Sequence, residues 1–192
     1  MYRKYSDGII EVITGPMFSG KSEELIKRIR ILSYAEIPTL VIKPAIDNRF
    51  SNSDIISRNG TSIKSYSIST VDEIKKLFES NKYKALVVDE IQFFDIELIN
   101  YIDQLANKGI RIIACGLDQD YLRRPFNVVA QLMAIADSVL KLKAVCLICK
   151  KAASCSFRTS SSNDTIEIGD TDKYEARCRE CHMNGMNENT KQ

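Results

Sequence analysis

The sequence lacks any long hydrophobic run, and it lacks a large excess of charge of either sign. No apolar stretch in the 192 residues approaches the roughly 20 residues that a membrane-spanning helix needs. The formal net charge is +2, which provides no electrostatic footprint for a nucleic acid or an anionic membrane. We therefore expect neither a membrane nor a nucleic acid among the partners of this protein.

The sequence also lacks an internal repeat and a secretory segment. Residues 1–7 are polar, and the apolar run that follows is too short for a signal peptide. We therefore expect a cytoplasmic protein. In that reducing compartment, its six cysteines favour metal ligation or burial over disulfide bonds. A chain of this length buries about 70% of its unfolded surface, so its main core needs no metal or disulfide.

The first motif is a glycine-rich loop between a short apolar run, Ile9–Ile13, and a segment with helical periodicity, Glu23–Tyr34. The glycines let backbone N–H groups turn toward one anion, and the N-terminus of the following helix also favours phosphate. Lys21 supplies a cation for the β- and γ-phosphates, and Ser22 supplies an oxygen ligand for Mg²⁺. An ordinary glycine turn is the alternative, but the flanking elements favour an ATP site. The pattern Gly-x-x-x-x-Gly-Lys-Ser is matched by Gly15, Pro16, Met17, Phe18, Ser19, Gly20, Lys21 and Ser22.

The second motif is Ala85–Glu90, in which four apolar residues are followed by two carboxylates. This pattern predicts a central parallel strand whose polar end lies at the edge where α/β sheets bind ligands. Asp89 would then lie near the Mg²⁺, and Glu90 could face the reacting end of the site. The same pattern occurs at plain surface strand ends, but behind a phosphate-binding loop it favours a catalytic role.

Strands and helices alternate from Ile9 to Ala144, which predicts an α/β fold with a mostly parallel sheet covered on both faces. We expect a P-loop nucleotide-binding core in residues 1–144, with a functional or mobile polar loop at 43–59. Ser69 or Thr70 is expected to cap one helix. The strands are expected at 9–13, 38–42, 63–66, 85–90, 110–115 and 138–145, and the helices at 23–34, 71–78, 94–107 and 126–137.

Four of the six cysteines form two Cys-x-x-Cys pairs, Cys146/Cys149 and Cys178/Cys181, with 28 residues between them. Two such pairs in a cytoplasmic chain are typical of a structural zinc site with four thiolate ligands. His182 is an alternative fourth ligand, although its adjacency to Cys181 would strain the second pair. A redox role is the other alternative. It is disfavoured because neither pair is expected to open a helix after a strand.

These pairs delimit a zinc-binding domain at residues 145–182. The polar segment between them is predicted to be a substrate lid whose base is held by the metal. A surface insertion without a role is the alternative. Cys155, which belongs to neither pair, is expected to be buried or a spare thiol. Residues 183–192 are polar and are expected to form a disordered tail.

Taken together, the motifs resemble those of the cytosolic, zinc-containing type II thymidine kinases, over nearly the whole chain from Ile10 to Cys181. The resemblance implies a RecA-like core that transfers the γ-phosphate of ATP to the 5′-hydroxyl of thymidine, and a homotetramer inhibited by dTTP. The matching pieces are Gly15–Ser22, Asp-x-Arg at Asp47 and Arg49, Asp-Glu-x-Gln-Phe-Phe at Asp89–Phe94, Gly-Leu-Asp at Gly116–Asp118, Arg-Pro-Phe at Arg124–Phe126, and Ile-Gly-x-x-x-x-Tyr-x-x-x-Cys-Arg-x-Cys at Ile168–Cys181.

The resemblance also implies roles for individual residues. Glu90 corresponds to the general base for the 5′-hydroxyl, while Lys21 and Arg49 bring positive charge to the transferring phosphoryl group. Asp89 and Gln92 join the glycine-rich loop in binding ATP and Mg²⁺. The lid would hold the thymine base mainly through backbone groups. The thymidine site comprises an apolar cup and the lid, with Met17, Asp47, Leu117, Tyr121, Phe126, Ser156, Ile166, Ile168, Gly169 and Tyr174.

Two features depart from the family pattern. Tyr121 stands where relatives usually have phenylalanine, which preserves the ring, and residues 159–164 match no family pattern.

Two other functions are alternatives to a thymidine kinase. A P-loop ATPase would use Glu90 to orient water, but a lid that excludes water argues against this function. A zinc-ribbon nucleic-acid-binding module needs a basic patch, and this chain offers a thin one in Lys150, Lys151, Arg158, Arg177 and Arg179.

Overall fold

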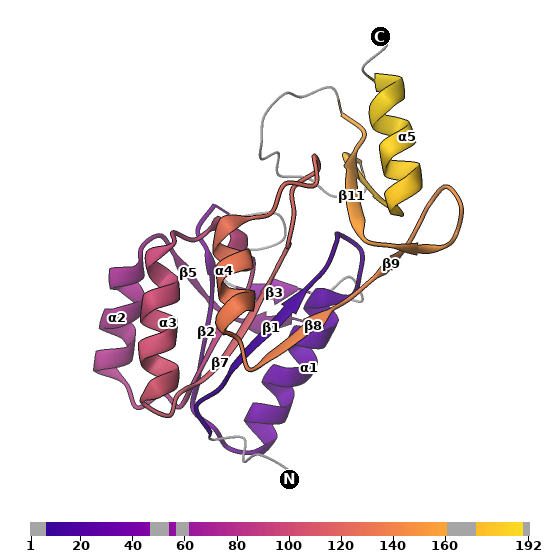
Figure 1. The fold of residues 1–192 in the computed structure, drawn as a ribbon. Coiled ribbons are helices and arrows are strands. Elements are labelled where there is room, and N and C mark those ends of the chain that lie inside the picture. The colour runs from indigo at the N-terminus through magenta and orange to yellow at the C-terminus, as the bar shows by residue number, and fades with distance from the viewer. Residues whose placement is uncertain (1–6, 47–53, 57–61, 161–171, 190–192) are drawn as a thin grey trace.

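The centre of the protein is a parallel β-sheet (Figure 1). The computed structural model describes residues 7–46, 54–56, 62–160 and 172–189. Six strands form the sheet in the order β5-β2-β6-β7-β1-β8, and every neighbouring pair is parallel. The predicted α/β class with a mostly parallel sheet is therefore confirmed. The strands are β1 (Ile10–Thr14), β2 (Thr39–Pro44), β5 (Tyr66–Ile68), β6 (Ala85–Val88), β7 (Arg111–Gly116) and β8 (Ser138–Lys141).

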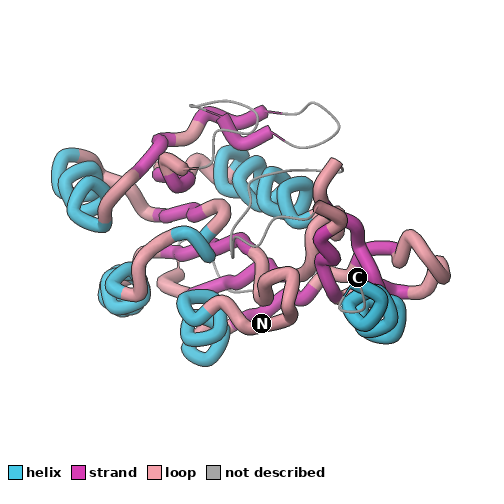
Figure 2. Tube along the Cα trace, turned by 90° about the horizontal axis from the view of Figure 1, so that it is seen from above, coloured by secondary structure: helices cyan, strands magenta, loops and turns pink. Residues whose placement is uncertain are grey.

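Helices cover both faces of this sheet, as the view from above shows (Figure 2). Side chains alternate between the two faces along each strand, so the core is divided into two layers. In β1, Ile13 contributes to the layer beneath α1, while Val12 contributes to the layer beneath the other three helices. The helices that cover the sheet are α1 (Lys21–Tyr34), α2 (Val71–Ser80), α3 (Glu97–Asn107) and α4 (Asn127–Ile135).

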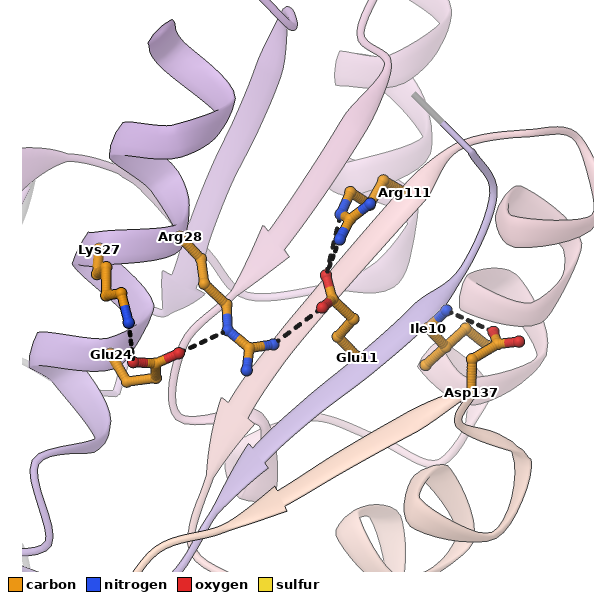
Figure 3. Close-up of polar contacts among 7 residues, drawn as sticks. All are labelled: Ile10, Glu11, Glu24, Lys27, Arg28, Arg111 and Asp137. Carbon is orange, nitrogen blue, oxygen red and sulfur yellow. Dashed lines mark hydrogen bonds and ion pairs between the residues drawn. The ribbon is translucent and has the colours of Figure 1, made fainter. Parts of the chain in front are cut away.

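A chain of ion pairs crosses the α1 face of the sheet (Figure 3). Glu11 of β1 accepts from Arg111 of β7 at 2.7 Å and from Arg28 of α1 at 3.1 Å. Arg28 also donates through Nε to Glu24 at 3.0 Å. These contacts tie α1 to two neighbouring strands near the start of β7, at the end of the sheet opposite the glycine-rich loop.

The expected helices are present, and the structure shows what sets the N-terminal boundaries of α2 and α3. Thr70 caps α2, since its side chain accepts from the Glu73 backbone N–H at 3.3 Å, and this confirms one of the two predicted caps. The helix predicted from residue 94 begins at Glu97, because a short 3₁₀ turn, η1 (Ile91–Phe93), follows β6 and Phe94 is extended. Hydrophobic periodicity alone does not separate such a turn from the helix that follows it.

A small lobe lies beyond the carboxyl end of the sheet (Figure 1). Its strands pair as two antiparallel ladders, β9 with β10 and β11 with β12. A further antiparallel pair, β3 with β4, forms a separate two-stranded sheet. The elements are β3 (Asp54–Ile56), β4 (Ser62–Lys64), β9 (Ala144–Val145), β10 (Ala152–Ala153), β11 (Cys155–Arg158), β12 (Tyr174–Arg177) and α5 (Arg179–Asn189).

The structure corrects two expectations about the C-terminal third of the chain. The single strand predicted at 138–145 is two strands in different sheets. Leu142, between them, donates to the Thr14 carbonyl oxygen at 2.8 Å as the chain leaves the sheet. The disordered tail predicted from residue 183 is wrong for residues 183–189, because α5 continues to Asn189. Among the described residues, no helix combines the length and apolar character that would let it span a bilayer.

Candidate active site and metal centre

The glycine-rich loop joins β1 to α1 at the carboxyl end of the sheet. Gly15 and Gly20 have φ values of 139° and 83°, which favour glycine, and a Cβ at Gly15 would overlap the Leu142 carbonyl oxygen. The Pro16 carbonyl oxygen accepts from Ser19 Oγ at 2.8 Å and from Lys21 Nζ at 2.7 Å. The loop thus folds around its own lysine, and the N-terminal N–H groups of α1 border it.

Lys21 lies among acidic groups from two other strand ends. Burial lowers the pKa of Lys21, and the negative charges of the Glu90 and Asp89 carboxylates oppose that effect. Burial also raises the pKa of the Cys115 thiol well above its usual value, so Cys115 is a neutral core residue. A partly buried ammonium flanked by carboxylates is a chemical environment that can hold both phosphate oxygens and a hard cation.

Asp89 and Glu90 directly follow β6, which is separated from β1 by β7 alone. Asp89 is buried, and its Oδ1 accepts from the Glu90 backbone N–H at 3.0 Å. Glu90 is partly exposed and has a left-handed backbone with φ 48°. For a residue with a side chain this conformation costs about 1–3 kcal/mol, and such strain concentrates at functional sites. Glu90 is thus turned out of the strand direction at its exit.

Residues 117–126, between β7 and α4, form a loop that we call the Tyr121 loop and that Asp120 stabilises. Buried Asp120 Oδ1 accepts from the backbone N–H groups of Leu122 and Arg124 at 2.9 and 2.8 Å. Its Oδ2 pairs with Arg124 Nε at 2.7 Å. Phe126, at the end of this loop, packs against the core beneath α2, α3 and α4. These contacts place Tyr121 at the tip of a tightly closed hairpin.

The small lobe contacts the glycine-rich loop and the Tyr121 loop. Ser156 Oγ accepts from the Met17 backbone N–H at 3.0 Å. The Arg158 guanidinium lies over the Tyr121 ring, 3.8 Å from its centroid, and Arg158 Nη2 donates to the Tyr174 hydroxyl at 2.9 Å. Four predicted substrate residues, Met17, Tyr121, Ser156 and Tyr174, are therefore brought to one interface.

The four paired cysteines meet at the base of the lobe. Their sulfurs all lie within 4.8 Å of one another, and those of Cys149 and Cys178 are 3.6 Å apart. Tetrahedral ligands at a zinc–sulfur distance of about 2.3 Å would be about 3.8 Å apart. This arrangement can hold a metal ion and fits zinc.

The thiols also differ in protonation. Burial raises the pKa of Cys146, but backbone N–H groups of Cys149, Cys178 and Ile148 outweigh it and lower the value to about 6. Burial and the neighbouring sulfurs raise the pKa of Cys181 to about 12. Four thiolates so close together need a cation to offset their charge, which supports a metal centre over free thiols.

The redox alternative was disfavoured on a premise that the structure contradicts. Cys178 follows β12 and immediately precedes α5, so the second pair does open a helix after a strand. The proximity of both pairs, and not their secondary structure, is what favours metal ligation. His182 lies outside the cysteine cluster. Its Nε2 is 2.8 Å from the Tyr121 carbonyl oxygen, and its ring packs edge-on against Phe157.

The structure reduces the basic patch predicted for a nucleic-acid-binding module. Arg158 is buried, and Arg177 lies 3.5 Å from the centroid of the Phe157 ring, so two of the five cations of that patch engage aromatic rings within the protein. This weakens the case for a nucleic-acid surface.

Five residues of the predicted active site lie outside the described residues: Asp47, Arg49, Ile166, Ile168 and Gly169.

Three residues of the site were missed by sequence reasoning. Arg158 was counted as a surface cation, and His182 only as a possible ligand. Asp120 was not considered, although aspartate is a recognised turn residue whose side chain accepts from backbone N–H groups that follow it in the chain. The contacts of Arg158 and His182 with Tyr121 span 37 and 61 residues, and no local pattern predicts pairs so far apart.

The family model and the most similar sequences agree on one family. The family model described as thymidine kinase matches residues 8–182. A thymidine kinase of Mycoplasma mobile is 59% identical over 185 residues, covering 96% of this chain and 92% of that protein. A thymidine kinase of Mesomycoplasma hyopneumoniae is 56% identical and covers 95% of this chain and 99% of its own. A thymidine kinase of Metamycoplasma arthritidis is 50% identical and covers 98% of this chain and 97% of its own. Domain III of the Thermotoga maritima replication initiation protein DnaA overlaps 69% of this chain and 54% of its own, with 17% identity and a TM-score of only 0.40.

Proposed function

Because this chain belongs to the thymidine kinase family, we propose that it transfers the γ-phosphate of ATP to the 5′-hydroxyl of thymidine, giving ADP and dTMP. The observation that carries this proposal is the meeting of Lys21, Asp89 and Glu90 at one end of the sheet, where the lobe that bears Tyr174 contacts the glycine-rich loop. A phosphate cradle, a candidate base and an aromatic enclosure are the parts that such a transfer needs.

The glycine-rich loop and Lys21 are proposed to bind the triphosphate. Lys21 Nζ donates to the Pro16 carbonyl in this structure, and it would exchange that partner for phosphate oxygens when ATP binds. Ser22 and Asp89 provide oxygen ligands that suit Mg²⁺, which supplies charge neutralisation for the β- and γ-phosphates when bound. Arg49 is proposed to add positive charge at the same point.

Glu90 is proposed to accept the proton of the 5′-hydroxyl as its oxygen attacks the γ-phosphorus. The bond between that phosphorus and the bridging β–γ oxygen then breaks, and ADP leaves with the electron pair. The transition state is loose, so the carboxylate chiefly orients the hydroxyl, and its placement matters more than its basicity. The left-handed backbone at Glu90 supports this role, because backbone strain of this kind concentrates at functional sites.

Tyr121, Met17, Leu117 and Phe126 are proposed to surround the thymine ring, with Tyr174 above it. The lid is proposed to complete the enclosure with Ser156 and, from outside the described residues, Ile166, Ile168 and Gly169. A zinc ion held by the four cysteines would fix both ends of this lid. Family membership is also the basis on which we infer a homotetramer and inhibition by dTTP.

The direct test is to incubate the purified protein with ATP, Mg²⁺ and thymidine and to separate the nucleotides chromatographically. We expect dTMP and ADP in equal amounts, and an absence of dTMP would overturn the proposal. A matched control uses 5′-deoxythymidine, which lacks the accepting hydroxyl. ADP release that is equally fast with that analogue, or with no nucleoside, would instead favour the P-loop ATPase.

A further inference from the structure

Gln92 lies between the candidate base and the loop that follows β7. It is 6% exposed, in η1, and its side-chain Nε2 donates to Glu90 Oε2. Its Oε1 accepts from the Leu117 backbone N–H at 3.0 Å. Both ends of the amide are therefore engaged by the protein itself, one by Glu90 and the other by the main chain.

The orientation of this amide follows from chemistry. A backbone N–H can only donate, so the group that faces Leu117 must be the oxygen of Gln92. The NH₂ group is then directed at Glu90, where it meets a carboxylate that can only accept. A charged acceptor makes this hydrogen bond stronger than one between neutral groups.

Gly116 provides the space that this arrangement needs. A Cβ at Gly116 would overlap Gln92 Oε1, and it would also lie 2.8 Å from Ile91 Cγ2. The φ of Gly116 is outside the range that excludes side chains, so the requirement for glycine here comes from space and not from backbone conformation. The family motif places Gly116 directly before Leu117, which is the residue that binds the amide.

We propose that Gln92 is a positioning residue that holds the Glu90 carboxylate for proton transfer, and that it is not a ligand of ATP. This rests on the proposed role of Glu90 as the base. The amide links the ends of β6 and β7, so the carboxylate is fixed relative to the strand edge that also carries the Tyr121 loop. A displacement of about 1 Å at such a group can cost on the order of 100-fold in rate.

The first experiment separates positioning from nucleotide binding. Gln92→Met preserves the shape and removes both hydrogen bonds, whereas Gln92→Glu preserves the oxygen that accepts from Leu117 and removes the donor to Glu90. For both variants we expect kcat to fall about 10- to 100-fold, with the Kd for ATP within about twofold of wild type. ATP binding by calorimetry also reports that each variant is folded. A Kd raised tenfold at unchanged kcat would overturn the proposal and make Gln92 a nucleotide ligand.

A double-mutant cycle tests whether Gln92 acts through Glu90. If it does, Gln92→Met should change kcat less than about twofold in a Glu90→Ala background, because the group that it positions is gone. An equal loss of rate in both backgrounds would overturn the proposal. A wild-type protein that forms no dTMP would instead overturn the proposed function, so the two failures are distinguishable.

Gly116→Ala disturbs the same amide without changing its chemistry. We expect it to lower kcat as Gln92→Met does, since the new methyl group occupies the position of Gln92 Oε1. Gly109→Ala is the matched control. Gly109 has φ 85° with no atom within 4 Å of the added Cβ, so the substitution strains the backbone far from the site. It should lower the melting temperature and leave kcat unchanged. Gly116→Ala with wild-type kcat would contradict the proposal.

Discussion

Arg158 of the small lobe lies over the ring of Tyr121 from the core, with its guanidinium carbon 3.8 Å from the ring centroid. Arg158 is 4% exposed, and its Nε and Nη2 reach the Tyr174 hydroxyl at 3.3 and 2.9 Å. One cation thus connects the two aromatic residues that are proposed to enclose the nucleoside. The lobe and the core are thus joined at the proposed nucleoside site.

We expect Arg158→Met to raise the KM for thymidine about tenfold and to leave the KM for ATP unchanged. A desolvated cation–π contact is worth about 2 kcal/mol, and without it the two rings lose their common anchor. Steady-state kinetics with each substrate varied in turn will check this. Arg177→Met is the control, because Arg177 stacks on Phe157 and pairs with Glu175 within the lobe. Equal effects of the two substitutions would show that only lobe stability is involved.

Glu90→Gln should keep ATP binding and lower kcat about 10²- to 10⁴-fold, since the amide cannot accept the proton of the 5′-hydroxyl. Single-turnover measurements with saturating ATP and thymidine will show whether the chemical step is the one affected. Glu97→Gln, at the start of α3, removes an acidic side chain that has no place in the proposed site and serves as the control. Turnover near the wild-type rate in Glu90→Gln would remove Glu90 from the role of base.

Cys149→Ser should lower the zinc content of the purified protein and raise the KM for thymidine. One ligand is lost, and the lobe strands that carry Ser156 and Tyr174 lose their fixed base. Metal analysis alongside kinetics will test both effects. Cys155→Ser is the matched control, because Cys155 is a buried cysteine of the same lobe that lies outside the cluster. Full zinc content in Cys149→Ser would exclude Cys149 as a ligand.

The ATP-dependent rate should decline on the alkaline side at a pH below 10.5, the ordinary pKa of lysine. Burial lowers the pKa of Lys21, so rising pH removes its proton earlier than for an exposed lysine, and the phosphates lose a cation. The measurement is kcat/KM for ATP against pH, with recovery at neutral pH as the test of reversibility. Lys21→Arg should show no such decline, since arginine stays charged. A wild-type profile that stays flat to pH 10.5 would contradict this assignment.

Glu11→Gln should lower the free energy of unfolding by about 2 kcal/mol and leave kcat unchanged. Glu11 is 14% exposed and pairs with both Arg28 and Arg111, so its neutralisation removes the negative charge that lies between these two poorly solvated cations (Figure 3). Urea titration monitored by circular dichroism will measure the change. Asp72→Asn breaks an exposed pair with Lys75 and should have no measurable effect. Equal stabilities of the Glu11 and Asp72 variants would show that burial of the Glu11 pairs contributes nothing.

Sequence reasoning was most successful where the chemistry is local. The glycine-rich loop, the Asp89–Glu90 strand end and the two cysteine pairs each lie within a few consecutive residues, and their spacing is itself the functional requirement. The alternation of strands and helices also determined the fold class. It did not separate η1 from α3, or β8 from β9, because apolar character continues across both breaks.

The tertiary structure alone decided how these local motifs meet. The strand order places β7 between β1 and β6, so Gly116 and Leu117 emerge beside Glu90, and Gln92 can bind both sides of that gap. Likewise, Arg158 became part of the proposed nucleoside site only because the lobe folds back on Tyr121. Contacts of this kind depend on strand order and on packing between residues far apart in the chain. Local spacing determines which chemistry a segment can perform, whereas packing determines which segments act together.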